Sequence, residues 1–185
     1  MIHRIKNFFL TGKIKVGKTT VLNKVLKNSF FDNLTIKGYK TKPLVDNSAV
    51  KGYTFETLNG VKEIFAHVNL LSSEKFDRYR TNPQIFDDLG VKTLKNAIIN
   101  GDIILMDEIG VIENKAQKFK KMVLKCLNST KLTMGVFQQR TFWFTDLILK
   151  RQDTLIFEIT ENNRDTIHFE IIKKIYENSK IILTN

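Results

Sequence analysis

The sequence of 185 residues contains little cysteine, little histidine and no long hydrophobic segment. Its one cysteine, Cys126, cannot form a disulfide within the chain, and three scattered histidines form no zinc-binding cluster. No apolar run approaches the roughly 20 residues that a membrane-spanning helix needs, and the amino terminus lacks the hydrophobic region of a secretory signal. We therefore expect a soluble, cytoplasmic protein with no membrane partner.

The sequence has fewer acidic than basic residues. It contains 19 aspartates and glutamates and 30 lysines and arginines, so its formal net charge is +11. A basic surface attracts phosphate backbones, so nucleic acid is a partner to consider. The lysines are spread along the whole chain, however, together with many asparagines and isoleucines. Genome composition explains that pattern as readily as a binding face, so the charge alone does not establish nucleic-acid binding.

The most informative segment is a phosphate-binding motif near the amino terminus. Residues 12–20 read G-K-I-K-V-G-K-T-T directly after a short apolar run, and they match the Walker A pattern G-x-x-x-x-G-K-[ST]. Gly12 and Gly17 permit the tight path that aims several backbone amides at one phosphate. Lys18 would place its charge on the β- and γ-phosphates, and Thr19 would offer its hydroxyl to Mg²⁺. The predicted nucleotide-binding residues are Gly12, Lys13, Ile14, Lys15, Val16, Gly17, Lys18, Thr19 and Thr20.

A strand that ends in two carboxylates lies in the middle of the chain. Residues 103–106 read I-I-L-M, an apolar run typical of a strand buried in a parallel sheet, and Asp107 and Glu108 come next. This is the pattern of a Walker B strand. Asp107 would face the Mg²⁺ ion that Thr19 also binds, and Glu108 would orient the water that attacks the γ-phosphate. Lys18 and Glu108 are therefore predicted catalytic residues, and Thr19 and Asp107 are predicted metal ligands.

Strand and helix patterns alternate along the chain without a repeat or an obvious linker. This alternation predicts an α/β fold in a single domain over residues 1–185. The pair Asn59-Gly60 favours a two-residue turn, so an antiparallel hairpin is expected within a mostly parallel sheet that has helices on both faces. Strands are expected at 8–10, 36–41, 53–58, 61–68, 103–106, 132–137 and 154–160. Helices are expected directly after the phosphate loop, from Asn82-Pro83 to Asn100, around Cys126, at 143–150 and around 167–175. The helix around Cys126 has an apolar stripe that includes the cysteine, so Cys126 is expected to be a core residue.

Two arginines are candidates for stabilising charge in the transition state. Arg140 follows the expected strand at 132–137, so it would emerge at the carboxyl edge of the sheet, where open α/β folds bind ligands. An arginine finger accelerates hydrolysis about 10³- to 10⁵-fold, which makes Arg140 a predicted catalytic residue. A solvent-facing loop position is the alternative. Gln138, Gln139 and Arg151 could join Arg140 in a basic lid, or Arg151 could supply the charge itself.

Five segments stand in an order that resembles a known family. They are 12–20, Gly38–Thr41, Lys51–Tyr53, Met106–Gly110 and Glu161–Asp165. The order is similar to that of the small thermophile-type, or cancer-related, nucleoside triphosphatases, and the resemblance covers nearly the whole chain. It implies a RecA-like P-loop core that hydrolyses ATP, GTP and other nucleoside triphosphates to the diphosphate and phosphate with Mg²⁺. Its N-R-D segment implies that Asn163 and Arg164 contact the nucleotide, although an asparagine there could equally cap the last helix.

This chain departs from the family in its phosphate loop, which usually reads close to G-x-P-G-x-G-K-T-T. Ile14 and Lys15 stand where proline and glycine are expected. Other P-loop proteins tolerate a residue other than glycine at the position of Lys15, so we expect nucleotide binding to survive.

Other functions share parts of this pattern. A small-molecule or nucleotide kinase of P-loop fold differs mainly in placing an acceptor hydroxyl, rather than water, in line with the γ-phosphate. Lys13 stands where the MinD and ParA ATPases carry a lysine that reaches the partner's nucleotide, so a nucleotide-switched dimer or a nucleic-acid-binding ATPase is a further alternative. Residues 107–110 also satisfy the D-x-x-G pattern of switch GTPases, but no N-K-x-D follows to recognise guanine. We expect a monomer or a weak dimer.

Overall fold

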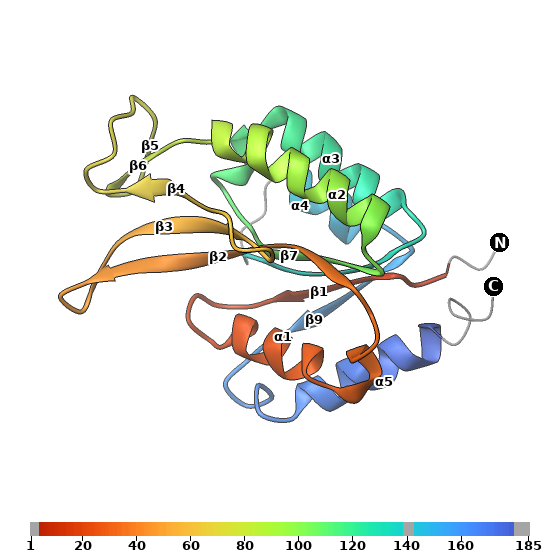
Figure 1. Cartoon of the computed structure of the whole chain (residues 1–185). Coiled ribbons are helices and arrows are strands. Elements are labelled where there is room, and N and C mark those ends of the chain that lie inside the picture. Colours follow the sequence, from red (N-terminus) through yellow and green to blue (C-terminus); the bar gives the residue numbers. More distant parts are fainter. Residues whose placement is uncertain (1–3, 139–142, 180–185) are drawn as a thin grey trace.

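The computed structural model of this chain describes residues 4–138 and 143–179. Within these residues, nine strands form one sheet in the order β5-β6-β4-β3-β2-β7-β8-β1-β9 (Figure 1). The strands are β1 (Asn7–Thr11), β2 (Ile36–Asp46), β3 (Ala49–Thr57), β4 (Lys62–His67), β5 (Lys75–Phe76), β6 (Tyr79–Thr81), β7 (Ile103–Ile109), β8 (Leu132–Phe137) and β9 (Thr154–Glu158). The helices are α1 (Lys18–Leu26), α2 (Val91–Asn100), α3 (Gln117–Asn128), α4 (Trp143–Leu149) and α5 (Ile167–Ser179), with short turns of helix at η1 (Ser29–Phe31), η2 (Phe86–Gly90) and η3 (Glu113–Lys115).

The half of the sheet that holds β1 and β7 is parallel. β2, β7, β8, β1 and β9 run in one direction, and each pairs in parallel with its neighbour. Their carboxyl ends therefore meet at one edge of the sheet, which is where open α/β folds bind ligands. This arrangement confirms the α/β fold that the alternating pattern predicts.

Helices cover both faces of the parallel strands. α1 and α5 lie on one face, and α2, α3 and α4 lie on the other (Figure 1). Successive side chains of a strand point to opposite faces. Ile104 and Met106 of β7 therefore enter the core with α2 and α3, while Ile103 and Leu105 enter the core with α1 and α5. A strand buried on both faces needs the continuous apolar run seen in the sequence.

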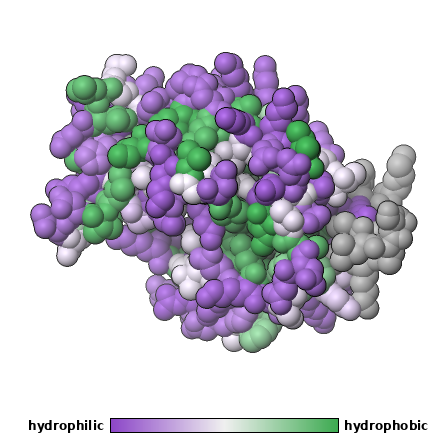
Figure 2. Space-filling view, in the orientation of Figure 1, coloured by the Kyte–Doolittle hydropathy of each residue, from purple (hydrophilic) through white to green (hydrophobic). Residues whose placement is uncertain are grey.

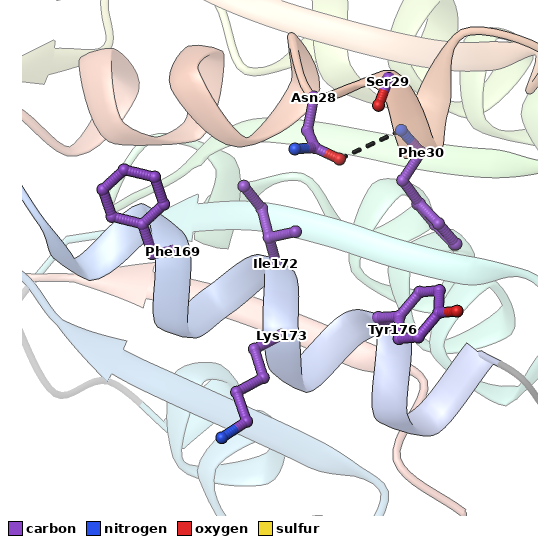
Figure 3. A pocket seen from close by; sticks show the side chains of 7 residues that line it. All are labelled: Asn28, Ser29, Phe30, Phe169, Ile172, Lys173 and Tyr176. Atoms are coloured by element: carbon purple, nitrogen blue, oxygen red, sulfur yellow. Dashed lines mark hydrogen bonds between the residues drawn. The ribbon is translucent and has the colours of Figure 1, made fainter.

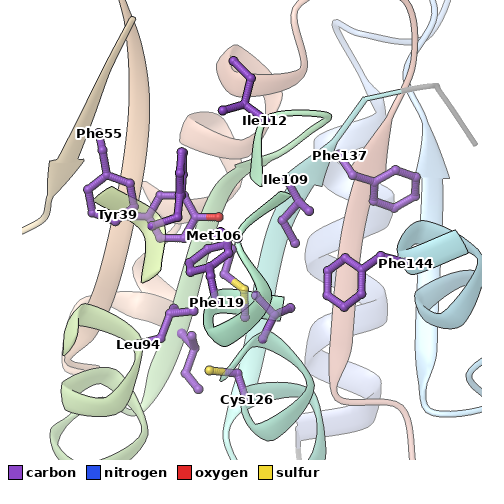
Figure 4. Close-up of a cluster of buried hydrophobic side chains, with 14 of the residues drawn as sticks. Tyr39, Phe55, Leu94, Met106, Ile109, Ile112, Phe119, Cys126, Phe137 and Phe144 are labelled. Atoms are coloured by element: carbon purple, nitrogen blue, oxygen red, sulfur yellow. The ribbon is translucent and has the colours of Figure 1, made fainter. Parts of the chain in front are cut away.

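Aromatic rings form the centre of the larger core (Figure 4). The ring of Tyr39 stacks on Phe55 with centroids 4.6 Å apart and meets the edge of Phe119 at 5.7 Å. Cys126 lies in the same cluster, and burial raises the pKa of its thiol to about 12. The sequence-based assignment of Cys126 to the core is therefore confirmed.

The remaining strands form an antiparallel wing that is larger than the expected hairpin. We call residues 42–81 the wing. β3 and β4 pair as predicted around the Asn59-Gly60 turn, where Gly60 has φ +97°. β2 runs on past Thr41, however, and turns back into β3 through Asn47 and Ser48, both with positive φ. This turn was missed because it contains no glycine, and β5 and β6 were missed because such short strands have no alternation to detect.

The helix expected from Asn82-Pro83 is divided in two. The side chain of Asn82 accepts a hydrogen bond from the amide of Gln84 at 3.2 Å, but the next turns form the wider helix η2 before α2 begins at Val91. Gly90 lies at the junction, where an added Cβ would stand 2.8 Å from the ring of Phe119. The close contact with α3 therefore depends on glycine, which is a tertiary requirement. α2 ends at Gly101 as predicted.

The helices of this structure are short. Among the described residues, no helix combines the length and the apolar character needed to cross a bilayer.

Candidate active site

The phosphate loop joins β1 to α1 at the carboxyl edge of the parallel strands. Gly12 has φ +140°, and a Cβ there would lie 2.4 Å from the carbonyl oxygen of Ile159, so no other residue fits. Gly17 has φ +110° and precedes the first residue of α1. Lys15 also has a positive φ, +63°, although it is not glycine. A residue with a side chain is strained in that left-handed conformation, which is the position where the sequence resemblance leads us to expect glycine.

Lys18 is held inside the loop rather than in solvent. Its side chain is buried, and its ammonium donates hydrogen bonds to the carbonyl oxygens of Gly12 at 2.8 Å and Lys13 at 2.9 Å. Burial lowers the pKa of Lys18, while the nearby Glu108 and Asp107 raise it. An ammonium group has three donors, so one N–H remains to bind an anion within the loop.

Thr19 and Asp107 come together although 88 residues separate them in the sequence. The hydroxyl of Thr19 donates to Oδ1 of Asp107 at 3.1 Å. The Asp107 side chain is only 2% exposed, and burial raises its pKa to about 6. Its second oxygen, Oδ2, is buried and has no hydrogen-bond partner. Mg²⁺ prefers hard oxygen ligands, and the free Oδ2 of Asp107 and the hydroxyl of Thr19 are two such oxygens.

Among the described residues, no group of three or more histidine, cysteine or acidic side chains gathers as metal ligands. Mg²⁺ does not require such a group, since it usually keeps several waters and binds one or two carboxylates together with substrate phosphates. Asp107 and Thr19 therefore fit a Mg²⁺ ion that a nucleotide helps to hold.

Glu108 lies next to this pair, at a bulge where the pairing of β7 with β8 shifts between Asp107 and Ile109. The amide of Gln138 donates a hydrogen bond to its carboxylate, and the hydroxyl of Tyr39 donates to its backbone oxygen at 3.0 Å. Burial raises the pKa of Glu108, whereas Gln138 and Lys18 lower it. Glu108 is thus held at its carboxylate by Gln138 and at its backbone by Tyr39, near the Lys18 ammonium.

The other residues of the predicted loop differ in exposure. Lys13, Ile14 and Lys15 form its exposed tip, where the side chain of Ile14 is 72% exposed. Val16 is buried in the core with α1, and Thr20 is exposed.

Asn163 and Arg164 follow β9 at the same edge. The side chain of Asn163 accepts from the amide of Thr160 at 2.8 Å and donates to the oxygen of Glu158 at 2.9 Å, so it braces the loop after the strand. Arg164 is exposed, and its Cδ lies 3.8 Å from the point where Gly17 would carry a Cβ. Arg164 thus lies beside the phosphate loop, as its predicted role requires.

Of the two arginines predicted to stabilise the transition state, the structure describes only Arg151. Arg140 and Gln139 lie outside the described residues. Arg151 donates to both oxygens of Asp153 at 2.8 Å and to the oxygen of Leu127 at 3.1 Å. The backbone of Asp153 in turn accepts from Asn7 at the start of β1, which is the amino edge of the sheet. The suggestion that Arg151 acts on the transition state is therefore wrong, because the residue lies at the opposite edge from the phosphate loop.

Sequence reasoning missed two charged residues near the site. Lys40 stands opposite Asp107 in the pairing of β2 with β7, and its ammonium donates to the side chain of Asn23 at 2.9 Å. Glu113 is buried behind the bulge and accepts a hydrogen bond from the amide of Gly110 at 3.0 Å. Lys40 is placed by the pairing register of β2 with β7, and no sequence motif indicates that register. Glu113 could have been noticed as an acid that directly follows the apolar pair Val111-Ile112, three residues after Gly110.

A shallow hollow of about 470 Å³ lies between η1 and α5, away from the phosphate loop (Figure 3). Phe30, Phe169, Ile172 and Tyr176 give it an apolar lining, and Lys173 extends from its rim. Its lining shares no residue with the phosphate loop or with the end of β7, so it is separate from the site described above.

Comparison with known proteins agrees with this geometry. A family model described as NTPase matches residues 7–172. The nucleoside-triphosphatase THEP1 of Thermotoga maritima is 31% identical over 166 residues, which cover 88% of this chain and 91% of that protein. The chain belongs to the THEP1 nucleoside-triphosphatase family. A THEP1 protein of Methanocaldococcus jannaschii is 29% identical over 168 residues, covering 90% of this chain and 95% of that protein.

Solved structures of similar proteins share the THEP1 fold. The crystal structure of THEP1 from Aquifex aeolicus matches with a TM-score of 0.76 at 24% identity and covers 90% of this chain and 97% of that one. The solution structure of a human cancer-related nucleoside triphosphatase also matches with a TM-score of 0.76 at 24% identity, covering 92% and 97%. These likenesses confirm the P-loop α/β fold. Membership in the THEP1 family confirms the resemblance drawn from the five sequence segments.

Proposed function

We propose that this member of the family is a Mg²⁺-dependent enzyme that hydrolyses ATP, GTP and other nucleoside triphosphates to the diphosphate and phosphate. The observation that carries the proposal is the contact of Thr19 with Asp107, which brings the two Walker motifs together and leaves Asp107 Oδ2 buried without a partner. The curated relatives are named nucleoside-triphosphatases, which supports the same reaction.

The phosphate loop binds the substrate in this proposal. Its backbone amides and the positive end of α1 attract the phosphate oxygens. Lys18, already fixed by two carbonyl oxygens, gives its remaining N–H to the β- and γ-phosphates.

Asp107 and Thr19 would hold the metal ion. When bound, Mg²⁺ neutralises charge on the phosphate oxygens and helps to align the γ-phosphate for in-line attack. Asp107 must then be ionised, and its neighbours Lys18 and Lys40 favour that state by lowering its pKa.

Glu108 would orient the attacking water. Gln138 and Tyr39 hold it at the edge of the sheet near Lys18. A base held in this way contributes through geometry, because small displacements of a positioned group strongly reduce the rate. Arg140 remains our candidate for stabilising the transition state, and Arg164 for contacting the nucleotide beside the loop.

The decisive experiment is the measurement of phosphate release from ATP, GTP, CTP and UTP with Mg²⁺ and without an added acceptor. We expect steady release from several triphosphates, and a loss on the order of 100-fold or more for Lys18→Ala and for Glu108→Gln. Lys173→Ala is the control, since this lysine is exposed on α5 away from the site, and its turnover should equal that of the wild type.

The two variants separate two steps. Lys18→Ala should weaken nucleotide binding itself, whereas Glu108→Gln should leave binding intact. Tight binding without phosphate release in the wild type would contradict the proposal and favour the kinase alternative, which acceptor screening then tests. Turnover of Glu108→Gln near the wild-type value would remove Glu108 from its water-orienting role.

We further propose that residues 1–185 form one P-loop domain that acts in the cytoplasm as a monomer or weak dimer. The continuity of one sheet from β5 to β9 supports the single domain. Lys13 is exposed at the tip of the loop, which leaves a nucleotide-switched dimer as the arrangement to test by sedimentation with and without ATP. A salt titration of binding to mixed-sequence DNA and RNA tests the basic surface.

A further inference from the structure

A fully buried carboxyl lies behind the proposed site and is not used by the Walker motifs. Glu113 begins η3, four residues after the end of β7, and only 5% of it is exposed. Its Oε2 accepts a hydrogen bond from the amide of Gly110 at 3.0 Å. Acidic side chains are rarely buried unless they are paired or hydrogen-bonded in this way, because burial costs free energy. The burial of Glu113 therefore suggests a specific role for this side chain.

The bond to Glu113 closes the turn that follows the Walker B strand. Asn114 donates its amide to the oxygen of Gly110 at 3.2 Å, and Gln138 donates its amide to the oxygen of Ile109 at 3.3 Å. A Cβ on Gly110 would stand 3.0 Å from Glu113 Oε2 and 3.1 Å from the side chain of Gln138. The side chains of Glu113 and Gln138 therefore both pack against the space that a Cβ of Gly110 would fill.

Gln138 connects this turn to Glu108. Its backbone N–H donates to the oxygen of Ile109, and its side chain packs on Gly110. The side-chain amide of Gln138 donates a hydrogen bond to the carboxylate of Glu108. Tyr39 holds the backbone oxygen of Glu108 on the other side. The position of Glu108 is thus set by a chain of contacts that begins at Glu113.

We propose that Glu113 is a positioning residue for hydrolysis, which fixes the Gly110 turn so that Gln138 holds Glu108 toward the attacking water. The inference rests on the water-orienting role of Glu108 proposed above. Glu113 itself touches no substrate, because it lies below the turn and out of solvent.

Glu113 also accepts the hydrogen bond of the Gly110 N–H, the group that the D-x-x-G pattern would assign to sensing a γ-phosphate. In switch GTPases, that glycine N–H must be free to bind the phosphate. Here the Gly110 N–H donates to a side chain of its own turn. The turn therefore serves as a fixed support for Glu108 and not as a phosphate sensor.

The chemistry of the buried acid suits this role. Burial raises the pKa of Glu113 to about 8, and the nearby Glu108 raises it as well. At neutral pH, the acid is therefore protonated, and its carboxyl accepts the Gly110 hydrogen bond without placing a second negative charge beside Glu108. A glutamine can make the same bond with its amide oxygen, whereas a methionine of similar length cannot.

The test compares Glu113→Gln with Glu113→Met for ATP hydrolysis with Mg²⁺. For Glu113→Met, we expect kcat to fall by about 10-fold or more while KM stays within about 3-fold, because a displaced base slows the chemical step without weakening the phosphate loop. For Glu113→Gln, we expect most of that kcat to be recovered. A purely structural role would change the amount of folded protein but not kcat per folded molecule.

Three further measurements keep the outcomes separate. Glu63→Ala on the exposed part of β4 is the control for removing an acid, and its kcat should match the wild type. Circular dichroism and binding of a non-hydrolysable ATP analogue establish that each variant is folded and binds nucleotide. Glu108→Gln, measured beside them, tests the role on which the inference rests.

Equal kcat for Glu113→Met, Glu113→Gln and the wild type, with Glu108→Gln inactive, would overturn the positioning role and leave the proposed function intact. Full activity of Glu108→Gln would instead overturn the role of Glu108. If Glu113→Met does not fold, Glu113→Leu replaces it, and a kcat equal to that of Glu113→Gln again overturns the inference.

Discussion

Asp107 illustrates how the environment of one residue determines its chemistry. The side chain is almost completely buried, one oxygen accepts from Thr19 and the other has no partner. An unpartnered carboxylate oxygen in a buried position costs free energy, since it loses its hydration without a compensating bond. Such a cost is typical of a site that is completed by a ligand.

Replacing Asp107 by asparagine keeps the shape but removes the charge. We expect Mg²⁺-dependent turnover of ATP to fall on the order of 100-fold, because a neutral amide is a poor ligand for a hard cation. Binding of nucleotide measured without Mg²⁺ should change little, since Lys18 and the loop amides are intact. Asp46→Asn, at the exposed end of β2, is the control. Unchanged Mg²⁺ dependence of Asp107→Asn would show that the ion binds elsewhere.

The buried acid Glu113 makes stability depend on pH in a direction that can be derived. Its folded pKa of about 8 lies above the ordinary 4.5, so the folded protein keeps this proton up to about pH 8 while the unfolded chain loses it near pH 4.5. Between these values the unfolded state binds fewer protons, and the free energy of unfolding falls as pH rises. The contribution is fully present below pH 4.5 and is lost above pH 8.

Glu113→Gln has no such titration, so it should gain stability relative to the wild type as pH rises from 5 to 8.5. The whole difference of about 3.5 pKa units corresponds to roughly 5 kcal/mol, of which roughly 4 kcal/mol falls between pH 5 and pH 8.5. Urea unfolding at both pH values measures the change, and Glu63→Gln, with an exposed acid, should show none. Parallel pH dependence of wild type and Glu113→Gln would mean that Glu113 ionises at its ordinary pKa in the folded protein.

At the scale of elements, the strand, loop and helix around the phosphate loop form one unit. Gly12 permits the chain to leave β1 and pass under Ile159, which follows β9. Gly17 then allows the turn into α1, so that Thr19 lies in its first turn beside Asp107. The motif predicts the loop and the start of α1 because the contacts that shape them are mostly local in sequence, whereas the contacts with Ile159 and Asp107 join distant segments.

A substitution at Gly12 tests this unit. Gly12→Ala should abolish nucleotide binding and lower stability, because the added Cβ would stand 2.4 Å from a backbone oxygen that cannot move alone. Gly60→Ala is the matched control. It also places alanine at a positive φ, +97°, but nothing lies within 4 Å of the added Cβ.

The control should lose only about 1 kcal/mol of stability and keep full activity. Equilibrium binding of ATP and urea unfolding measure both variants. Nucleotide binding by Gly12→Ala at wild-type affinity would show that the loop has room to shift, against the geometry described here.

Longer elements were predicted less completely. The N-G turn between β3 and β4 was correct, but the extension of β2 depends on backbone pairing with β3, which adds no local signal. The division of the helix after Asn82 similarly depends on Gly90 meeting Phe119 of another helix. Both differences arise from contacts between segments that are distant in sequence.

At the scale of the whole molecule, aromatic residues connect the wing to the helices on the parallel strands. Phe86 of η2 contacts Phe55 of β3, Phe65 of β4 and Phe119 of α3, with ring centroids 4.9 to 5.5 Å apart. Phe86 is completely buried in this cluster. The wing should therefore unfold together with the rest of the sheet.

Removing this ring should destabilise the molecule as a whole. We expect Phe86→Ala to lower the free energy of unfolding by about 3 to 5 kcal/mol, because the substitution leaves a large cavity between the wing and the helices. Phe169→Ala, whose ring is 67% exposed on α5, should cost about 0.5 kcal/mol or less. Denaturant unfolding followed by circular dichroism compares them. A separate early transition for Phe86→Ala would show that the wing unfolds on its own.

Local patterns were enough to predict the phosphate loop, the acidic end of β7, the parallel α/β arrangement and the membership in a nucleoside-triphosphatase family. Each of these depends on neighbouring residues or on a regular alternation, so a single segment contains the information. The folded chain alone decided that Arg151 lies at the far edge, that Gln138 holds Glu108, and that Glu113 supports the turn beneath it. These contacts depend on strand order, pairing register and burial, which arise only when distant segments pack against each other.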